Sequence, residues 1–292
     1  MLKGILISLI SACAYATLPI LAKLGYEQGL TAVNMLTYRF CFGAGALAVL
    51  FLFIRRKALI PTPKLLLKCA GLGIGIYMIQ SLFFFSALKY IPASTTSLLL
   101  YLYPLIVLIL STVFLKVKFR FASLISIILI MAGCCLVFYD AFTRHLNITG
   151  ILLGLAAPIT FGINLTLSQV VLKNERPASV ALYMLMFTGA GYLVVNGGLD
   201  IASATSGQLM VGIALGVVPS AIAILTLYMA IDLIGATYVS VFSSIEPAVT
   251  LILAGILLGE NIVVYQIYGV LLLMLGIVMP NVKLMKKQSK VI

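Results

Sequence analysis

The chain of 292 residues has little charge, only seven acidic residues, one histidine and no tryptophan. Charged residues make up 9% of the sequence, whereas a water-soluble domain carries about 25%. The single histidine, His145, excludes a metal site built from several histidines. What the chain has instead is apolar: 63% of its residues are hydrophobic and the mean hydropathy is +1.22, which indicates an integral membrane protein.

Features of enzymes and of disulfide-bonded domains are also missing. The five cysteines lie inside or at the ends of apolar runs, which predicts free thiols and no disulfide framework. No pair of carboxylates, metal-ligand cluster or activated nucleophile is recognisable, so we expect no enzyme activity, no metal and no cofactor. A membrane enzyme and a sensor subunit stay as weaker alternatives; no soluble domain is recognisable that would report binding to a partner.

The apolar residues form long continuous runs, and these predict an all-α membrane protein rather than a barrel of short alternating strands. A helix needs about 20 apolar residues to cross a bilayer, and ten runs reach that length. The ten expected transmembrane helices span residues 3–22, 32–53, 66–88, 93–115, 121–139, 149–171, 178–198, 209–231, 236–258 and 262–282.

The net charge of +12 comes mostly from short basic segments between these runs and at the C-terminus, including residues 55–68, 116–120 and 283–290. Basic residues spread in this way argue against a nucleic-acid site and predict orientation by the positive-inside rule. We therefore expect a multi-pass protein of the cytoplasmic (inner) membrane of a prokaryote, with both termini cytoplasmic and the 140–147 loop outside.

The two halves of the chain are similar to each other. Ala93 and Pro104 match Ala236 and Pro247 at a separation of 143 residues, and the GAG triplet at 43–45 matches that at 189–191. Five spans are an odd number, so the second copy must enter the membrane the opposite way round. We expect two inverted five-helix repeats, residues 1–140 and 148–284, followed by a basic cytoplasmic tail, 285–292.

The most informative stretch is 234–260, an apolar run that contains the pair Glu246–Pro247. A carboxylate at the bilayer centre costs roughly 2.5 to 3.5 kcal/mol on insertion scales, so Glu246 must face protein or water. It is a candidate for coupling transport to protons or for neutralising a substrate amine; a structural carboxylate is the alternative. Pro104 and Pro247 predict breaks at matching places in two helices, as in transporter binding sites.

Polar side chains at helical spacing mark the helix faces that we expect to line a substrate cavity. For any one of them, a hydrogen bond between helices is the simpler interpretation. Arg39 is expected to snorkel outward or to support packing, rather than to bind an anion or to pair with Glu246. The cavity candidates are Tyr77, Gln80, Ser81, Ser97, Tyr101, Thr160, Asn164, Ser220, Tyr228, Ser240, Ser243 and Ser244.

Over nearly its full length the chain resembles the EamA-type members of the drug/metabolite transporter superfamily. The resemblance rests on Tyr15-Ala16 with Lys23, on Phe161-Gly162 with Lys173, on the segments SALKYIPAS at 86–94 and IEPAVTLILAGILLGE at 245–260, and on Gly133 and Gly276. The chain departs from the family pattern at Tyr15-Ala16, where many members carry tryptophan and glycine, and at Lys116-Val117, where many carry an acidic residue.

The resemblance implies a ten-helix fold with a central cavity that the first helix also lines, which adds Tyr15 to the candidates. It further implies an alternating-access exporter of small organic metabolites, with amino acids as the best guess and a proton-coupled drug exporter as the alternative. The expected partners are a small-molecule substrate and the lipid bilayer, with protons as an open alternative and no nucleic acid. A monomer or a weak homodimer is expected.

Overall fold

The computed structural model describes residues 2–54, 56–103, 106, 109–110, 125, 128–133, 135–136, 146–172, 175–234, 239 and 242–288. These residues form helices and the turns between them, with no strand among them. The helices are α1 (Leu2–Ala16), α2 (Leu18–Glu27), α3 (Ala32–Ile54), η1 (Arg56–Leu59), α4 (Pro63–Ala70), η2 (Gly71–Tyr77), α5 (Met78–Tyr90), α6 (Ala93–Leu100), α9 (Ile148–Leu172), α10 (Pro177–Asn196), α11 (Ser206–Gly216), η3 (Val217–Ile222), α12 (Ala223–Ile234), α14 (Glu246–Leu257) and α15 (Val264–Gln288).

Six stretches of the described chain are long and apolar enough to cross a membrane, and two shorter apolar helices follow them at Glu246–Leu257 and Val264–Gly276. The six are Leu2–Glu27, Ala32–Ile54, Pro63–Tyr90, Ile148–Ser168, Pro177–Asn196 and Ser206–Leu227. They coincide with six of the ten expected spans. Most of the fifth expected span, 121–139, and much of the fourth lie outside the described residues.

Two boundaries differ from the sequence-based expectation. The first span is two helices, because the chain turns at Thr17, just before Pro19 in the first turn of α2. Proline removes a backbone donor and tolerates the first turn of a helix far better than its interior. At the other end of the chain, α15 continues to Gln288 and therefore includes the first residues of the expected tail.

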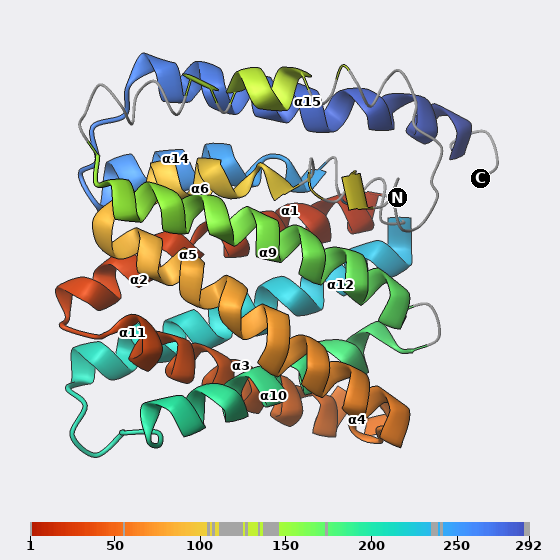
Figure 1. Ribbon diagram of the computed structural model, residues 1–292. Coiled ribbons are helices and arrows are strands. Elements are labelled where there is room, and N and C mark those ends of the chain that lie inside the picture. Colours follow the sequence, from red (N-terminus) through yellow and green to blue (C-terminus); the bar gives the residue numbers. More distant parts are fainter. Residues whose placement is uncertain are drawn as a thin grey trace.

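The helices run roughly side by side, and α1 begins at the same end of the bundle at which α15 finishes (Figure 1). The connection between α3 and α4 lies at that end too, while the connection between α10 and α11 lies at the opposite end (Figure 1). This arrangement is expected when the chain crosses the membrane an even number of times between the start of α1 and the end of α15. Which side of the membrane each end faces stays a prediction from the charge distribution.

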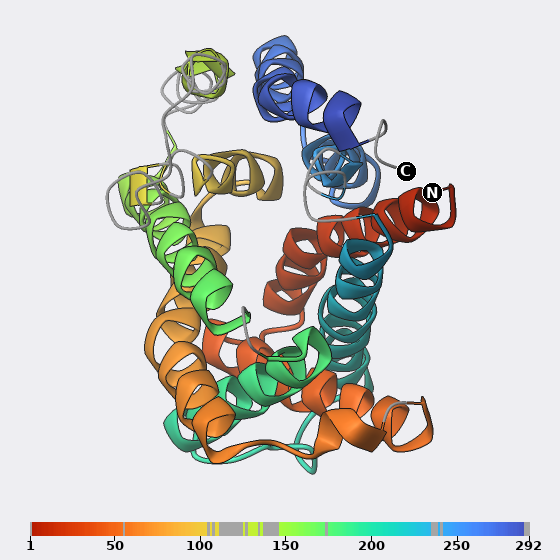
Figure 2. The same cartoon turned by 90° about the vertical axis from the view of Figure 1, so that its right-hand side faces the viewer.

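Helix contacts between the halves occur in pairs. The sequence repeat makes α9 the counterpart of α1, α10 of α3, α12 of α5 and α14 of α6. When each helix is replaced by its counterpart, the contact between α5 and α9 corresponds to the contact between α12 and α1, and both contacts are present. In the same way the α6–α9 contact becomes the α14–α1 contact, whereas α3–α10 and α6–α14 map onto themselves. Both halves also contain a π-helical segment, η2 from Gly71 and η3 from Val217, 146 residues apart. Seen along the helices, the bundle has two walls, one with α5, α6 and α9 and one with α1, α12 and α14 (Figure 2).

Two glycines permit matching close approaches between helices. A Cβ on Gly150 would lie 2.7 Å from the Ile91 and Tyr90 side chains, and a Cβ on Gly4 would lie 2.4 Å from the Ile234 side chain. Gly4 and Gly150 are 146 residues apart, and Ile91 and Ile234 are 143 apart, so the contacts correspond between the halves. In both places the backbone comes close to a β-branched side chain because glycine has no side chain.

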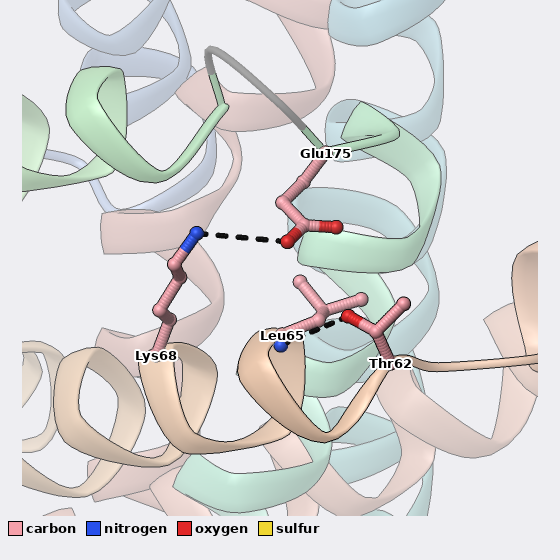
Figure 3. A network of polar contacts seen from close by, with 4 residues as sticks. All are labelled: Thr62, Leu65, Lys68 and Glu175. Atoms are coloured by element: carbon pink, nitrogen blue, oxygen red, sulfur yellow. Dashed lines mark hydrogen bonds and ion pairs between the residues drawn. The ribbon is translucent and has the colours of Figure 1, made fainter.

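An ion pair links α4 to the residue just before α10, and a helix cap stabilises the start of α4 (Figure 3). Lys68 Nζ lies 3.6 Å from Glu175 Oε1, just before α10 begins. The Thr62 hydroxyl accepts a 3.2 Å hydrogen bond from the Leu65 amide and so satisfies one of the free donors in the first turn of α4. The pair is partly exposed, so we expect it to contribute about 1 kcal/mol or less to stability.

Candidate functional site

The helix that carries Glu246 is interrupted, as Pro247 predicts. Residues 242–243 are helical, Ser244 and Ile245 form a turn, and α14 begins at Glu246 with Pro247 in its first turn. The chain therefore starts a new helix at the carboxylate instead of bending a continuous one. A carboxylate in a first turn interacts favourably with the partial positive charge of the helix N-terminus.

An equivalent break follows α6. This helix ends at Leu100, residues 101–102 form a turn, and residue 103 is helical again. The two turns, 101–102 and 244–245, are 143 residues apart, which is the separation of the repeated sequence around them. Pro104 itself lies outside the described residues. The interruption that the proline pair predicts is thus found at corresponding places of two helices that contact each other.

Glu246 lies beside two tyrosines from the broken end of α6. Tyr101 and Tyr103 both interact electrostatically with its carboxylate, and Tyr103 is its counterpart in the first half. The Tyr101 hydroxyl interacts with the Glu246 carboxylate without forming a full hydrogen bond. Within the described part of the chain, no lysine or arginine forms an ion pair with Glu246.

Aromatic rings continue from this pair of tyrosines to α9. The Tyr101 and Tyr103 ring centroids are 6.1 Å apart, and Tyr103 meets Phe161 edge to face at 4.9 Å. Gly162 allows this approach, since a Cβ there would lie 2.7 Å from the Ile106 side chain and 3.4 Å from the Tyr103 carbonyl oxygen. Edge-to-face aromatic pairs fix side-chain geometry, so this end of α6 is held against α9.

Four of the predicted cavity residues have buried polar atoms without a hydrogen-bond partner among the described residues. They are Gln80 Oε1 on α5, Ser97 Oγ on α6, Asn164 Oδ1 on α9 and the Tyr101 hydroxyl at the end of α6. Each of these residues is 3 to 6% exposed. The three helices contact one another. A buried polar atom without a partner costs about 1 to 3 kcal/mol, so these four atoms are the ones on which a ligand or an ordered water molecule would form hydrogen bonds at the lowest cost.

Other predicted residues have partners within the protein. The Thr160 hydroxyl donates to the Ala156 and Ala157 carbonyl oxygens, as is usual for threonine in a membrane helix. The Ser81 hydroxyl contacts the Tyr77 carbonyl oxygen at 2.7 Å and the Tyr192 hydroxyl at 3.0 Å. Ser220 contacts the Leu215 carbonyl oxygen at 3.0 Å. For Thr160 and Ser81 the simpler interpretation of hydrogen bonds that stabilise and join helices accounts for the contacts, whereas Ser220 also accepts a hydrogen bond from Arg39.

The remaining candidates are placed with less detail. Tyr15 and Tyr77 pack in the main apolar core, and the Tyr77 ring meets Phe40 edge to face at 5.3 Å. Ser244 is buried and Ser243 is partly buried, and both precede Glu246 at the helix break. Ser240 and the side chain of Tyr228 lie outside the described part of the structure.

Arg39 corrects one expectation, because it does not snorkel outward. Its side chain is 4% exposed, and its Nε donates a 3.1 Å hydrogen bond to Ser220 Oγ. Its guanidinium carbon lies 4.9 and 5.7 Å from the ring centroids of Phe40 and Phe85. Contacts between α3 and η3 therefore hold the arginine inside the bundle, which agrees with a packing role but not with outward extension.

Sequence reasoning assigned no site role to Glu260. Its Oε1 accepts a 2.6 Å hydrogen bond from the Ala93 amide, and its Oε2 accepts bonds of 3.1 and 2.6 Å from the Ser94 amide and hydroxyl. The N-cap residue of α6 is Pro92, whose side chain offers no acceptor. Pro92 indicates from the sequence that the first turn of α6 needs a hydrogen-bond acceptor from elsewhere. The sequence does not indicate that this acceptor is Glu260, which lies far away along the chain.

Within the described residues, no group of three or more histidine, cysteine, aspartate or glutamate side chains is placed to hold a metal ion.

The sequence profile of the EamA-like transporter family matches residues 2–139 and 148–282. An "Uncharacterized transporter" of Archaeoglobus fulgidus (strain ATCC 49558 / DSM 4304 / JCM 9628 / NBRC 100126 / VC-16) is 25% identical over 252 residues, which cover 85% of this chain and 88% of that protein.

A solved structure described as "Crystal structure of protein" has a TM-score of 0.68 at 18% identity and covers 95% of this chain and 96% of its own. That likeness concerns the fold. The family match covers nearly the whole chain, in agreement with the apolar spans and the interrupted helices. The chain thus belongs to the EamA-like transporter family, within the drug/metabolite transporter superfamily, and is a membrane transporter rather than an enzyme.

Proposed function

We propose that this transporter works by alternating access and exports small organic metabolites such as amino acids across the cytoplasmic (inner) membrane of a prokaryote. The observation that carries the proposal is the set of buried polar atoms on α5, α6 and α9 that have no partner among the described residues. These three helices contact one another, and α6 and α14 both carry a break, at Tyr101 and at Ser244. These buried polar atoms, together with the rings of Tyr101, Tyr103 and Phe161, suit a ligand with an apolar body and polar ends.

The proposed architecture is ten transmembrane helices in two inverted repeats, residues 1–140 and 148–284. The exchange of helix contacts between the halves and the matching glycine contacts support it. Inverted repeats favour alternating access because the two halves can adopt each other's conformation, which opens the site to one side or the other. On this proposal α6 and α14 move relative to α1 and α9 around a site at the two helix breaks.

Glu246 supports a second candidate, a proton-coupled drug exporter. A carboxylate between Tyr101 and Tyr103, without a cationic partner among the described side chains, is suited to take up a proton or an organic cation as the site opens. The two candidates differ in what drives the flux. Export of metabolites down their own gradient needs no proton movement, whereas the coupled exporter stops when the proton gradient is abolished.

The decisive experiment is transport in reconstituted vesicles loaded with a mixed metabolite extract, with and without a proton gradient. Compounds that leave vesicles containing the protein faster than empty vesicles are its substrates. Gln80→Ala and Asn164→Ala should lower the rate for these compounds roughly tenfold, the equivalent of about 1.4 kcal/mol. Thr226→Ala is the matched control, since its hydroxyl bonds only to its own helix. Failure to transport any compound, or equal rates in all variants, contradicts the proposal.

A further inference from the structure

Arg39 presents a positive charge inside the bundle that the described acidic side chains do not neutralise. The side chains of five of the seven acidic residues are described, and the only ion pair among them joins Lys68 and Glu175. Arginine stays charged at every pH at which proteins fold, so it cannot avoid the cost of burial by losing a proton. Charged side chains inside membrane helices mark functional sites by default.

The described residues accept one hydrogen bond from the Arg39 guanidinium. Its Nε bonds to Ser220 Oγ at 3.1 Å, and this is the only hydrogen bond the guanidinium makes to described residues. Its two terminal nitrogens carry four further N–H donors in the planar arrangement that matches a carboxylate. A purely structural arginine would be expected to use these donors on backbone carbonyl oxygens or on acidic side chains.

Groups around Arg39 are arranged to hold it in place. A Cβ on Gly43 would lie 3.0 Å from Ser220, so the glycine lets η3 approach α3 and brings Ser220 to the guanidinium. Tyr192 lies within electrostatic range of Arg39, and its hydroxyl bonds to the Met78 carbonyl oxygen and to Ser81. The arginine is therefore fixed by α3, α5, α10 and η3, while its charge has no counter-ion among the described side chains.

We propose that Arg39 binds the carboxylate end of the transported metabolite, with Ser220 as the residue that orients the guanidinium. This inference rests on the proposed transport function and narrows the substrate class to small organic acids and amino acids. An anion at Arg39 would neutralise the buried charge and accept a bidentate pair of hydrogen bonds from donors that no described residue engages. Amides of the same compounds lack the negative charge of the carboxylate and should bind more weakly.

The test uses thermal melting of the purified protein with a pool of the common amino acids and with a pool of the corresponding amino-acid amides. The wild type should melt at a higher temperature with the acid pool than with the amide pool. Arg39→Gln should abolish that difference, and Arg39→Lys should retain part of it. Lys89→Gln is the matched control, because it removes one positive charge at the exposed end of α5 and should keep the full difference.

If the wild type responds equally to both pools or to neither, Arg39 is not a carboxylate site, even where the vesicle experiment has found substrates. Retention of the full difference by a folded Arg39→Gln variant leads to the same conclusion. If Arg39→Gln does not yield folded protein, Ser220→Ala, which removes the orienting oxygen, should reduce the difference between the pools at least threefold. An unchanged difference in Ser220→Ala then overturns the inference.

A separate observation concerns the end of the bundle opposite the termini. Glu260 follows Gly259, whose φ of +62° turns the chain directly after α14. From there its carboxylate bonds to the Ala93 amide and to the Ser94 amide and hydroxyl, which satisfies donors in the first turn of α6. Lys23 of α2 lies within electrostatic range of the same carboxylate. Residues of both halves of the chain therefore meet at one carboxylate.

The corresponding position in the first half is 117, which is valine. The valine side chain has no acceptor, so it cannot accept the hydrogen bonds that the Glu260 carboxylate accepts. We infer that Glu260 is a one-sided latch: its bonds hold the end of the bundle opposite the termini closed, and opening of that end requires the carboxylate to leave α6. The inference does not depend on which compound is transported.

Labelling of a cysteine introduced at Ser97, by a membrane-impermeant thiol reagent, tests the latch. Rates are compared in intact cells and in inside-out vesicles, and the parent protein labelled in parallel gives the background from the native cysteines. Glu260→Gln keeps the shape and loses the charge, and it should raise the rate at least threefold in the preparation that exposes its end of the bundle. Ser94→Ala should act in the same direction.

Glu175→Gln is the control for this test, because it removes the ion pair with Lys68 at the opposite end of the bundle and should not raise labelling from the latch end. A carboxylate that only stabilises α6 predicts a lower melting temperature of Glu260→Gln with unchanged labelling. Unchanged labelling in both preparations, with normal amounts of protein in the membrane, overturns the latch.

Discussion

At the scale of single residues, the site depends on polar groups that the bundle buries without satisfying. Glu246 begins α14 beside Tyr101 and Tyr103, and the Tyr101 hydroxyl has no hydrogen-bond partner in the described chain. By contrast, the hydroxyl groups of Thr160 and Ser220 bond to carbonyl oxygens of their own or adjoining helices. The proposed site therefore draws on buried polar groups that have no partner among the described residues.

The role of Glu246 can be tested with a variant of nearly the same shape. Glu246→Gln keeps a hydrogen-bonding side chain at the first turn of α14 but cannot exchange a proton at neutral pH. If the carboxylate couples transport to protons or neutralises an amine, the variant should fold and should show a flattened pH dependence of vesicle transport or a lost preference for cationic amines. An unaltered pH profile and substrate order, at equal amounts of protein, would assign Glu246 a structural role.

At the scale of elements, close helix crossings depend on glycine at a few positions. Gly150 lets α9 pack against the end of α5, where the Tyr90 Cβ and the Ile91 side chain would lie 2.7 Å from an added methyl group. The Tyr90 Cβ is attached directly to the backbone and cannot turn away. Gly45 of α3, by contrast, has no atom within 4 Å of the position a Cβ would take.

These two glycines give a matched pair of variants. Gly150→Ala should lower the free energy of unfolding by about 1 to 3 kcal/mol, because overpacking forces the helices apart. Gly45→Ala should leave stability unchanged or raise it by up to about 1 kcal/mol, since alanine is the better helix former. Thermal melting in detergent compares the two. Equal melting temperatures would contradict the close crossing of α9 and α5.

At the scale of the whole molecule, the chain begins and finishes at one end of the bundle, and the contacts of one half reappear in the other with the helices exchanged (Figure 1). The asymmetry between the halves is chemical. Tyr103 corresponds to Glu246, and Val117 corresponds to Glu260, so the second half supplies both carboxylates. A transporter built in this way can have two similar conformations with unequal stabilities.

The prediction at the scale of the whole molecule concerns which end of the bundle faces the cytoplasm. Single cysteines placed at Lys57, between α3 and α4, and at Ala202, between α10 and α11, lie at opposite ends of the bundle. The positive-inside rule predicts labelling of Ala202→Cys in intact cells and labelling of Lys57→Cys only after the membrane is opened. The reverse pattern would show that the termini are not cytoplasmic and that the direction of export must be reconsidered.

The sequence alone determined the class of the protein, because long apolar runs and scarce charge leave few alternatives to membrane helices. It also predicted the helix breaks at Pro247 and near Pro104, since proline cannot continue a hydrogen-bonded helix. It singled out Gln80, Ser97, Tyr101 and Asn164 as residues of a substrate cavity; the structure buries all four, and their role in transport stays a proposal.

Only the tertiary structure decided which polar groups find partners. Glu260 bonds to residues 166 and 167 positions away, and Arg39 bonds to Ser220, 181 positions away. Such pairs depend on how helices from the two halves cross, and periodicity within one helix carries no information about them. For Arg39 the sequence left two structural roles open, snorkelling and packing, and the structure agrees with packing for this reason. The close approach of η3 at Gly43 encloses a side chain whose length alone would let it reach the membrane surface.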